Sequence, residues 1–208
     1  MTDPRCAPQP NHLQWIGGPG EMTQMQVSHP VIDLYRRPDG PRDRQVIFGE
    51  TVDVFGHRDG WSYCRTASTS YVGFIRTDAL AEVEGANLRV CTQWATLYHE
   101  PNFKTPDRLT IPHGSRLTSI DDNGAYWETP HGFVPKQQVT DTWASDPAAV
   151  ALGYLGTPYL WGGNSASGID CSGLVQAAYL ATGRTCPGDS DLMERGLKGE
   201  TPQSYARN

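Results

Sequence analysis

The chain has 208 residues, which gives room for one large domain or for two to three small ones. An apolar share of 38% and an aromatic share of 10% suffice for packed cores and exclude a disordered chain. The formal net charge is −6, and acidic residues interrupt the basic stretch RRPDGPRDR, so the composition argues against a nucleic-acid-binding protein.

Residues 1–27 are expected to form an N-terminal extension. Their first part, MTDPRCAPQPNHLQWIGG, has no apolar run and does not resemble a secretory signal, and no stretch of the chain is apolar for long enough to span a membrane. The five cysteines lack the spacing of a disulfide framework or metal site, and Cys6, Cys64 and Cys91 are interpreted as buried or incidental thiols. The sequence therefore predicts a cytoplasmic protein without metal or cofactor.

A repeated pattern fills residues 31–80 and 95–139. Each stretch has a Leu-Tyr-x-x-Pro opening, a Gly before an alternating run, an aromatic pair and a late Gly-Phe-Ile/Val. The matching pairs are Leu34–Pro38 with Leu97–Pro101, Gly49 with Gly114, Gly60–Tyr63 with Ala125–Trp127, and Gly73–Ile75 with Gly132–Val134. Alternation places one side of each strand inside. Each unit is therefore expected to be a small barrel of about five short strands that buries its sheet edges.

The order of these motifs, found twice, resembles bacterial SH3 domains in tandem. It predicts a first SH3-like domain over residues 28–84 and a second over residues 88–140. Two generic small barrels without a binding role are the alternative interpretation, and the repeat by itself leaves that alternative open.

Residues 146–208 have helical patterning. Asp146 is a good N-cap before Pro147, and the apolar stripe that follows is expected to end at Gly156. A glycine-rich loop then leads to Asp170, which can cap a helix running from Cys171 toward residue 182. Leu174, Val175 and Ala178 share a face with Cys171, and this face is expected to anchor the helix.

Cys171 stands in the first turn of that helix. Free backbone N–H groups and the positive end of the helix dipole favour a thiolate there, so the pKa of Cys171 is expected to fall below the free value of about 8.5. The carboxylate of Asp170 acts in the opposite direction, and a paired imidazolium would decide in favour of the thiolate. From helix position alone, a nucleophile and a buried structural thiol are equally good interpretations.

The segment PYLWGG…DCSGLVQ resembles the catalytic segment of the NlpC family of papain-like cell-wall peptidases, in which the Cys of D-C-S-G is the nucleophile. Two preceding bacterial SH3 domains match intracellular members, which cleave the γ-D-glutamyl–diaminopimelate bond of murein peptides with a free N-terminal L-Ala. The resemblance covers most of the chain. It implies a multi-domain fold, with two small all-β barrels followed by the N-terminal, helical part of an α+β papain-like domain at residues 146–208.

The resemblance implies roles for five residues. Cys171 would attack the amide carbon, and Tyr159 would line the site with its hydroxyl near the thiolate. Asp170 and Ser190 would hold the free α-amine of the substrate, and Tyr71 would close that pocket from the first SH3 unit. One ammonium group needs several acceptors and a carboxylate, so these residue types are chemically suitable. The alternatives are an aromatic residue on a barrel rim for Tyr71 and a helix cap for Ser190.

All six histidines precede Cys171. In the family, the base follows the cysteine on strands that pack against its helix, and no alternating strand pattern follows Gly183. His99, His113 and His131 lie in turn-like contexts of the second unit. None of these three is expected to act as the base, because a remote turn histidine lacks hydrogen-bond reach and a fixed ring.

Two hypotheses follow. In the first, the chain is a murein-peptide peptidase whose sequence continues beyond residue 208. In the second, it is a truncated, non-catalytic protein that binds cell-wall peptides through its SH3 domains. Under both, the 208-residue chain is expected to be inactive or nearly so and to bind neither nucleic acid nor membrane. Self-association is expected to be possible through the uncovered face of the helix at residues 171–182.

Overall fold

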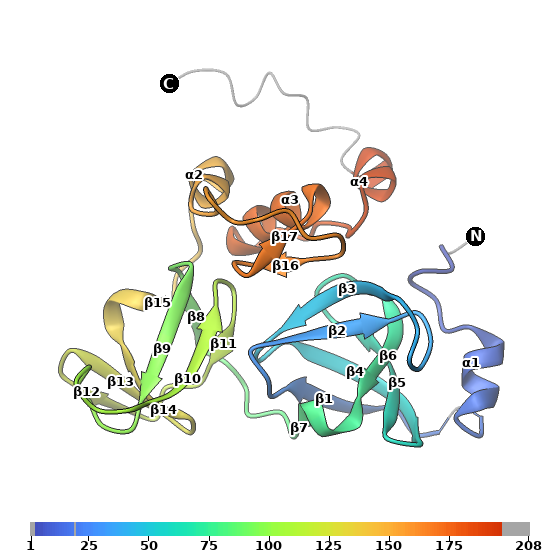
Figure 1. Ribbon diagram of the computed structural model, residues 1–208, viewed down its shortest axis with the longest axis horizontal. Coiled ribbons are helices and arrows are strands. Elements are labelled where there is room, and N and C mark those ends of the chain that lie inside the picture. The colour runs from blue at the N-terminus through green and yellow to red at the C-terminus, as the bar shows by residue number, and fades with distance from the viewer. Residues whose placement is uncertain (1–2, 19, 197–208) are drawn as a thin grey trace.

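Short strands make up two β units that lie side by side, and a helical C-terminal segment lies across both (Figure 1). The computed structural model describes residues 3–18 and 20–196. Among these residues, no helix has the length and apolar character needed to cross a membrane. The mostly β architecture with few helices agrees with the fold class that the sequence predicts.

The first β unit is one seven-stranded antiparallel sheet in the order β3-β2-β6-β5-β4-β1-β7. Its elements are β1 (Thr23–Val27), β2 (Val31–Tyr35), β3 (Arg42–Ile47), β4 (Thr51–Arg58), β5 (Trp61–Thr66), β6 (Val72–Arg76), the 3₁₀ turn η1 (Thr77–Ala79) and β7 (Leu80–Ala81). Alternate residues of these strands, such as Leu34, Val52 and Val54, point into one buried cluster.

The first sheet starts earlier than the sequence indicates. Residues 23–27 were expected to belong to the extension, but β1 pairs with both β4 and β7. Only the last two residues of β1 are buried, so the strand carries no apolar alternation that a sequence pattern could detect. Pairing with β4 and β7 therefore places this strand in the sheet, and Val27 at its end reaches the buried core.

The second β unit consists of a five-stranded sheet, β10-β9-β14-β13-β12, and a three-stranded sheet, β11-β8-β15. Its elements are β8 (Leu88–Val90), β9 (Trp94–Tyr98), β10 (Asp107–Pro112), β11 (Arg116–Leu117), β12 (Asp121–Asn123), β13 (Tyr126–Thr129), β14 (Gly132–Pro135), η2 (Lys136–Gln138) and β15 (Val139–Thr140). Its strand order repeats that of the first unit, with β11 and β12 together in the place of β4. Equivalent pairs also recur, since Tyr35 opposes Phe74 and Tyr98 opposes Phe133.

Phe48 joins the two units. It lies in the turn between β3 and β4 of the first unit, yet its side chain belongs to the buried core of the second, with Leu97 and Ile111. The Arg116 N–H donates to the Phe48 carbonyl at 3.1 Å. Gly49 has φ +74°, and a side chain there would collide with the Arg116 carbonyl, so glycine permits this close approach.

The N-terminal residues pack on the outer side of the first unit. Helix α1 (Pro10–Trp15) places the Trp15 ring edge-on to Phe74, at 5.4 Å between centroids. Ahead of the helix, the Val72 N–H donates to the Arg5 carbonyl at 2.8 Å. The extension is therefore fastened to the first sheet at both of these points (Figure 1).

The C-terminal segment contains α2 (Pro147–Leu152), a two-stranded ribbon of β16 (Asn164–Ser165) and β17 (Gly168–Ile169), α3 (Cys171–Ala181) and α4 (Ser190–Gly196). Asp146 caps α2 as expected, accepting from the Ala148 N–H at 2.8 Å. Helix α2 ends at Leu152, earlier than the Gly156 that the sequence indicates, because turns occupy the residues after it. Helix α3 begins at Cys171 behind its predicted cap Asp170, and Gly183 follows it with φ +76°.

Candidate active site

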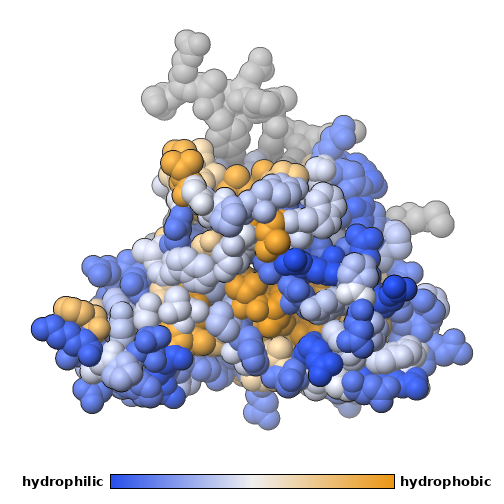
Figure 2. All heavy atoms as spheres, viewed as in Figure 1, coloured by the Kyte–Doolittle hydropathy of each residue, from blue (hydrophilic) through white to orange (hydrophobic). Residues whose placement is uncertain are grey.

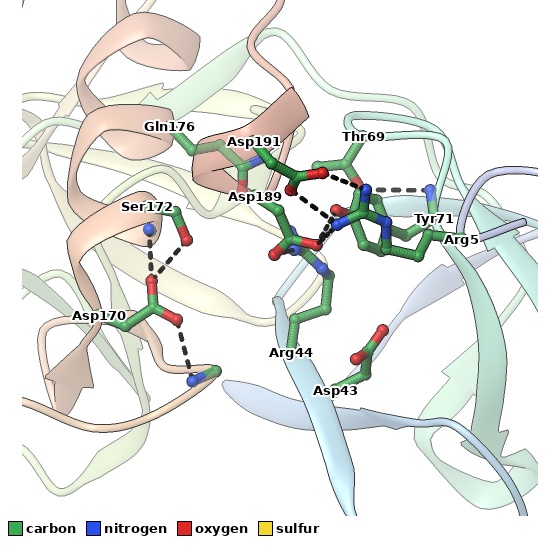
Figure 3. A network of polar contacts seen from close by, with 12 residues as sticks. Arg5, Asp43, Arg44, Thr69, Tyr71, Asp170, Ser172, Gln176, Asp189 and Asp191 are labelled. Carbon is green, nitrogen blue, oxygen red and sulfur yellow. Dashed lines mark hydrogen bonds and ion pairs between the residues drawn. The ribbon is translucent and has the colours of Figure 1, made fainter. Parts of the chain in front are cut away.

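Cys171 is the first residue of α3 and is exposed to solvent. The preceding Asp170 is held by three donors of its own segment. Its Oδ1 accepts from the Gly173 N–H at 2.6 Å and from the Ser172 hydroxyl at 2.9 Å, and its Oδ2 accepts from the Gly162 N–H at 3.0 Å (Figure 3). Asp170 thereby fixes the loop and the helix start relative to each other, and so it fixes the position of the thiol.

The glycines of this segment allow its loop to lie directly on the first turn of α3. A Cβ on Gly173 would lie 2.5 Å from the Gly163 carbonyl oxygen. A Cβ on Gly163 would collide with the Gly168 carbonyl in turn. The glycine-rich loop and the Gly after Cys-Ser are therefore required by backbone packing, and this packing presents Cys171 at the surface.

Tyr159 stands beside Cys171. A parallel bridge joins Tyr159 to Ile169, and the Leu160 N–H donates to the Ile169 carbonyl at 3.1 Å, so the tyrosine is tied to the strand that leads into α3. Partial desolvation, the nearby Cys171 and Asp170, and a hydrogen bond to Cys171 raise the pKa of Tyr159. The phenol therefore stays protonated at neutral pH and is able to donate to a thiolate.

The face that anchors α3 differs from the expected one. Val175 is 38% exposed, and Cys171 on the same face is also exposed. Ala178 of the expected face is buried, but the other buried residues, Ser172, Gly173 and Gln176, lie outside that face. Gln176 is completely buried, and its Nε2 donates to the Cys186 carbonyl at 3.1 Å, so α3 positions the loop that leads to α4.

A second polar cluster lies between that loop and the first β unit (Figure 3). The Tyr71 hydroxyl donates to Asp189 Oδ2 at 2.5 Å, and Arg44 donates to Asp189 Oδ1 at 3.2 Å while its guanidinium lies 3.6 Å from the centroid of the Tyr71 ring. Burial, and after it the hydrogen bond to Asp189, raise the pKa of Tyr71. The phenol is therefore a firm donor to this carboxylate.

Arg5, from the N-terminal extension, completes the cluster. Its guanidinium donates to Asp189 Oδ2 at 2.6 Å, to Asp191 Oδ2 at 2.7 Å and to Asp3 Oδ2 at 2.8 Å. Arg195 pairs with the same Asp191 oxygen. Three carboxylates thus face three guanidinium groups, those of Arg5, Arg44 and Arg195, and the cluster is balanced in formal charge.

The predicted site residues fall into two groups. Cys171, Tyr159 and Asp170 lie together at the start of α3, whereas Tyr71 lies against Asp189. None of the hydrogen bonds of Asp170 goes to Tyr71 or to Asp189. Ser190 is exposed and opens α4, while its neighbour Asp189 accepts the first helical bond through its carbonyl and so takes the cap position that was offered to Ser190.

Sequence reasoning missed Asp189, Arg44 and Arg5. Asp189 stands in the stretch PGDSDL beside the predicted Ser190, so a carboxylate next to a supposed amine contact was a usable signal. Arg5 and Asp189 are separated by 184 positions, and no local pattern relates them.

The histidines lie elsewhere. His113 Nδ1 is 2.9 Å from the Tyr154 hydroxyl, His131 Nε2 is 3.0 Å from Glu84 and His57 Nδ1 is 2.8 Å from Ser62. In the part of the chain that the structure describes, no hydrogen bond joins any of the six histidines to Cys171.

Two family models match the chain. Residues 34–80 match the bacterial dipeptidyl-peptidase SH3 domain, which lies within the first β unit. Residues 156–208 match the NlpC/P60 family, and this range contains the glycine-rich loop, Tyr159 and Cys171. The C-terminal segment is therefore similar to the NlpC/P60 family. The predicted resemblance to an SH3-bearing NlpC-type cysteine peptidase, a hydrolase, is thereby confirmed.

Two curated proteins are similar in sequence to this chain over most of its length. Dipeptidyl-peptidase 6 of Lysinibacillus sphaericus is 27% identical over 194 residues, covering 79% of this chain and 71% of the relative. The γ-D-glutamyl-L-lysine dipeptidyl-peptidase of Bacillus subtilis (strain 168) is 39% identical over 176 residues, covering 74% of this chain and 58% of the relative. The chain therefore spans less than two thirds of the second relative.

A solved NlpC/P60 family protein from Bacillus cereus ATCC 10987 has a similar fold. The TM-score is 0.71 at 20% sequence identity, and the match covers 83% of this chain and 77% of that protein. At this identity the likeness concerns the fold alone, and it agrees with the arrangement of β units and C-terminal segment.

Proposed function

We propose that this chain recognises murein peptides with a free N-terminal L-Ala and carries the nucleophile that hydrolyses their γ-D-glutamyl–diamino-acid amide bond. The pairing of Cys171 with Tyr159 at the start of α3 is the observation that carries the proposal. The names of the two curated relatives support a dipeptidyl-peptidase. The second β unit, which repeats the strand order of the first, is proposed to be a second SH3-like domain, and the location is proposed to be cytoplasmic.

In the proposed reaction, the Cys171 sulfur forms a bond to the amide carbon, and the negative charge that develops on the carbonyl oxygen is carried by nearby N–H donors. The C–N bond then breaks, the departing amine takes a proton, and water hydrolyses the thioester. Tyr159 orients the sulfur through its hydroxyl. The proton for the amine has to come from a general acid, and none of the six histidines lies within hydrogen-bond reach of Cys171.

The free amine of the peptide is proposed to bind at the cluster of Tyr71 and Asp189. Asp189 Oδ2 already receives Tyr71 and Arg5, while Oδ1 receives only Arg44 and keeps one position for a further donor. Asp170 also has one acceptor position left on Oδ2, so it could add one bond. Ser190, exposed beside Asp189, stays in the proposal as a second contact.

A binding protein without catalysis is the second candidate. It is favoured by the absence of a histidine contact to Cys171 among the described residues. The exposed apolar residues of the C-terminal segment, Leu155, Trp161 and Val175, would then serve self-association.

The test uses L-Ala-γ-D-Glu-diaminopimelate and its N-acetylated form, titrated calorimetrically into the 208-residue chain. The free-amine peptide is expected to bind more tightly, and Asp189→Asn is expected to remove about tenfold of that preference, because a charged hydrogen bond is lost. Asp191→Asn is the matched control, since Asp191 contacts Arg5 but not Tyr71. Equal binding of the two peptides to the unaltered chain would contradict the proposed recognition.

A second assay incubates the free-amine peptide with the chain, using Cys171→Ala as the blank. Little cysteine-dependent release of dipeptide is expected. General acid–base catalysis contributes about 10²–10⁴-fold to the rate, and among the described residues none of the six histidines contacts Cys171 to supply it. Turnover at an ordinary enzyme rate would show this expectation of inactivity to be wrong. It would assign the base to an upstream histidine or a partner chain.

A further inference from the structure

Two arginines face each other across the small sheet of the second β unit. Arg116 in β11 and Arg89 in β8 are register partners in an antiparallel pair. The neighbours Leu88, Val90 and Leu117 point into the core of the second unit, so by strand alternation both arginines point away from it. Like charges placed directly opposite each other in a sheet are destabilising.

Both side chains line one cavity. It has a volume of about 560 Å³ and lies where the two β units and the C-terminal segment meet. Ile47 of the first unit and Leu180 of α3 supply apolar wall, and the Trp143 ring stacks on Arg89, with the guanidinium carbon 3.5 Å from its centroid. Figure 2 shows apolar residues gathered at this junction between the polar outer surfaces of the two units.

The charge of the arginine pair is not neutralised within the wall. Neither guanidinium has a hydrogen bond or an ion pair with another of the residues that the structure describes, and one Nη of Arg89 is buried without a partner. Burial, and after it the charge of Arg116, lower the pKa of Arg89, while Asp141 acts weakly in the opposite direction.

Glu50 is the one acidic residue that lines the cavity among those described. It is 6% exposed, and its carboxyl accepts from the Ser68 hydroxyl. Burial raises the pKa of Glu50 above its ordinary value, although Arg116 and Arg44 act against this shift. Its carboxyl makes no ion pair with Arg89 or Arg116 among the described residues, and burial disfavours its charged form.

We propose that the cavity binds a small organic carboxylate, whose oxygens lie between Arg89 and Arg116 and whose apolar body lies against Trp143, Ile47 and Leu180. Guanidinium groups match carboxylates through paired N–H donors, and stacking on Trp143 fixes the plane of one of them. This site is separate from the thiol, because Cys171 does not line the cavity. The proposal does not depend on the peptidase function.

The probe is benzoate, titrated calorimetrically into the full chain at constant ionic strength, with benzyl alcohol as the uncharged equivalent and inorganic phosphate as a bare oxyanion. Benzoate is expected to bind and benzyl alcohol is not. Arg116→Gln is expected to weaken benzoate binding at least about tenfold, since a charged hydrogen bond is lost. Arg108→Gln is the matched control, because Arg108 is an exposed residue of the same β unit and carries the same charge.

Circular dichroism verifies that each variant is folded. If Arg116→Gln does not fold, Arg116→Lys replaces it, because lysine keeps the charge but not the paired donors. Loss of benzoate affinity at position 116 but not at position 108 supports the site. The proposal is overturned if the variants at positions 116 and 108 bind benzoate equally tightly. It is also overturned if the unaltered chain does not bind benzoate. Tighter binding of phosphate than of benzoate overturns the assignment to an organic carboxylate.

Discussion

At the scale of single residues, removing the hydroxyl of Tyr71 tests how much its hydrogen bond to Asp189 contributes to the free energy of unfolding. Tyr71→Phe removes one donor from a carboxylate, and hydrogen bonds to charged groups contribute about 1.5–3 kcal/mol. Asp189 is 36% exposed, so the lower end of that range is expected. The measurement is the free energy of unfolding in urea.

Tyr63→Phe is the matched control for Tyr71→Phe. Tyr63 is also buried, but its hydroxyl accepts from the neutral N–H of Gln9 at 2.9 Å. Its loss is expected to cost about 0.5–1.5 kcal/mol. A larger loss for Tyr63 than for Tyr71 would mean that the Asp189 contact does not stabilise the fold.

Glu50 makes stability depend on pH in a definite direction. Its pKa is raised above the ordinary 4.5 by burial. At pH values between the ordinary pKa, which holds in the unfolded chain, and the raised pKa of the folded chain, the folded chain binds more protons than the unfolded chain. The free energy of unfolding therefore falls as the pH rises through this range. Glu50→Gln removes the cost of burying a charged carboxylate. The variant is therefore expected to have a higher melting temperature at pH 8, by about 2–4 °C for each kcal/mol gained in the free energy of unfolding.

The comparison for Glu50→Gln is made at two pH values. At pH 4, below the ordinary pKa, the advantage of the variant is expected to shrink, because Glu50 is then mostly neutral in both states. Glu21→Gln, at an exposed position of the first unit, controls for the loss of one charge. An advantage that is equal at pH 4 and pH 8 would contradict a raised pKa.

The sequence predicted some residue contacts and not others, for a physical reason. Tyr159, Asp170 and Cys171 are close in sequence, and their loop has little freedom because its glycines pack backbone against backbone. Their roles in catalysis and amine binding stay predictions. The contacts of Asp189 with Arg5 and Tyr71 join residues from three parts of the chain, and only the tertiary arrangement brings them together.

At the scale of elements, the N-terminal extension places a cation where a peptide ammonium is proposed to bind. Arg5 fills one acceptor position of Asp189 Oδ2. Arg5→Ala frees that position and leaves the cluster with an excess negative charge. Under the proposed function, this variant is expected to bind L-Ala-γ-D-Glu-diaminopimelate several-fold more tightly in a calorimetric titration.

Arg195→Ala is the control for Arg5→Ala. It removes the same charge from the same cluster, but Arg195 contacts Asp191 and not Asp189. It is expected to change peptide affinity less than Arg5→Ala does. Weaker peptide binding by Arg5→Ala would mean that Arg5 supports the pocket instead of competing for it.

Elements were predictable where a local signal marks their ends. Caps at Asp146 and Asp170 located the starts of α2 and α3, because side-chain acceptors for free N–H groups are short-range features. Strand β1 was missed, since it is defined by pairing with distant strands. The anchoring face of α3 was predicted only in part: Ala178 is buried as expected, but Gln176 is buried as well and bonds to the Cys186 carbonyl, which apolar periodicity does not reveal.

At the scale of the whole molecule, the division into two β units and a helical segment followed from the internal repeat and the change to helical patterning. Their arrangement did not follow, because part of the contact between the two units comes from one phenylalanine in a turn. Phe48 is 1% exposed and packs against residues of the other unit, including His131 at 4.9 Å between ring centroids. A sequence pattern assigns Phe48 to the unit in which it lies, not to the core that it fills.

Phe48→Ala is therefore expected to destabilise the second unit and to uncouple it from the first. Removing a buried phenylalanine costs about 3–5 kcal/mol through lost burial and the cavity left behind. Calorimetry is expected to show two separated unfolding transitions, with the lower one belonging to residues 88–140, as identified by hydrogen exchange. Phe103→Ala, at a position 67% exposed in the same unit, removes the same atoms from the surface and is expected to change little. A single transition, shifted equally by both substitutions, would mean that Phe48 does not hold the two units together.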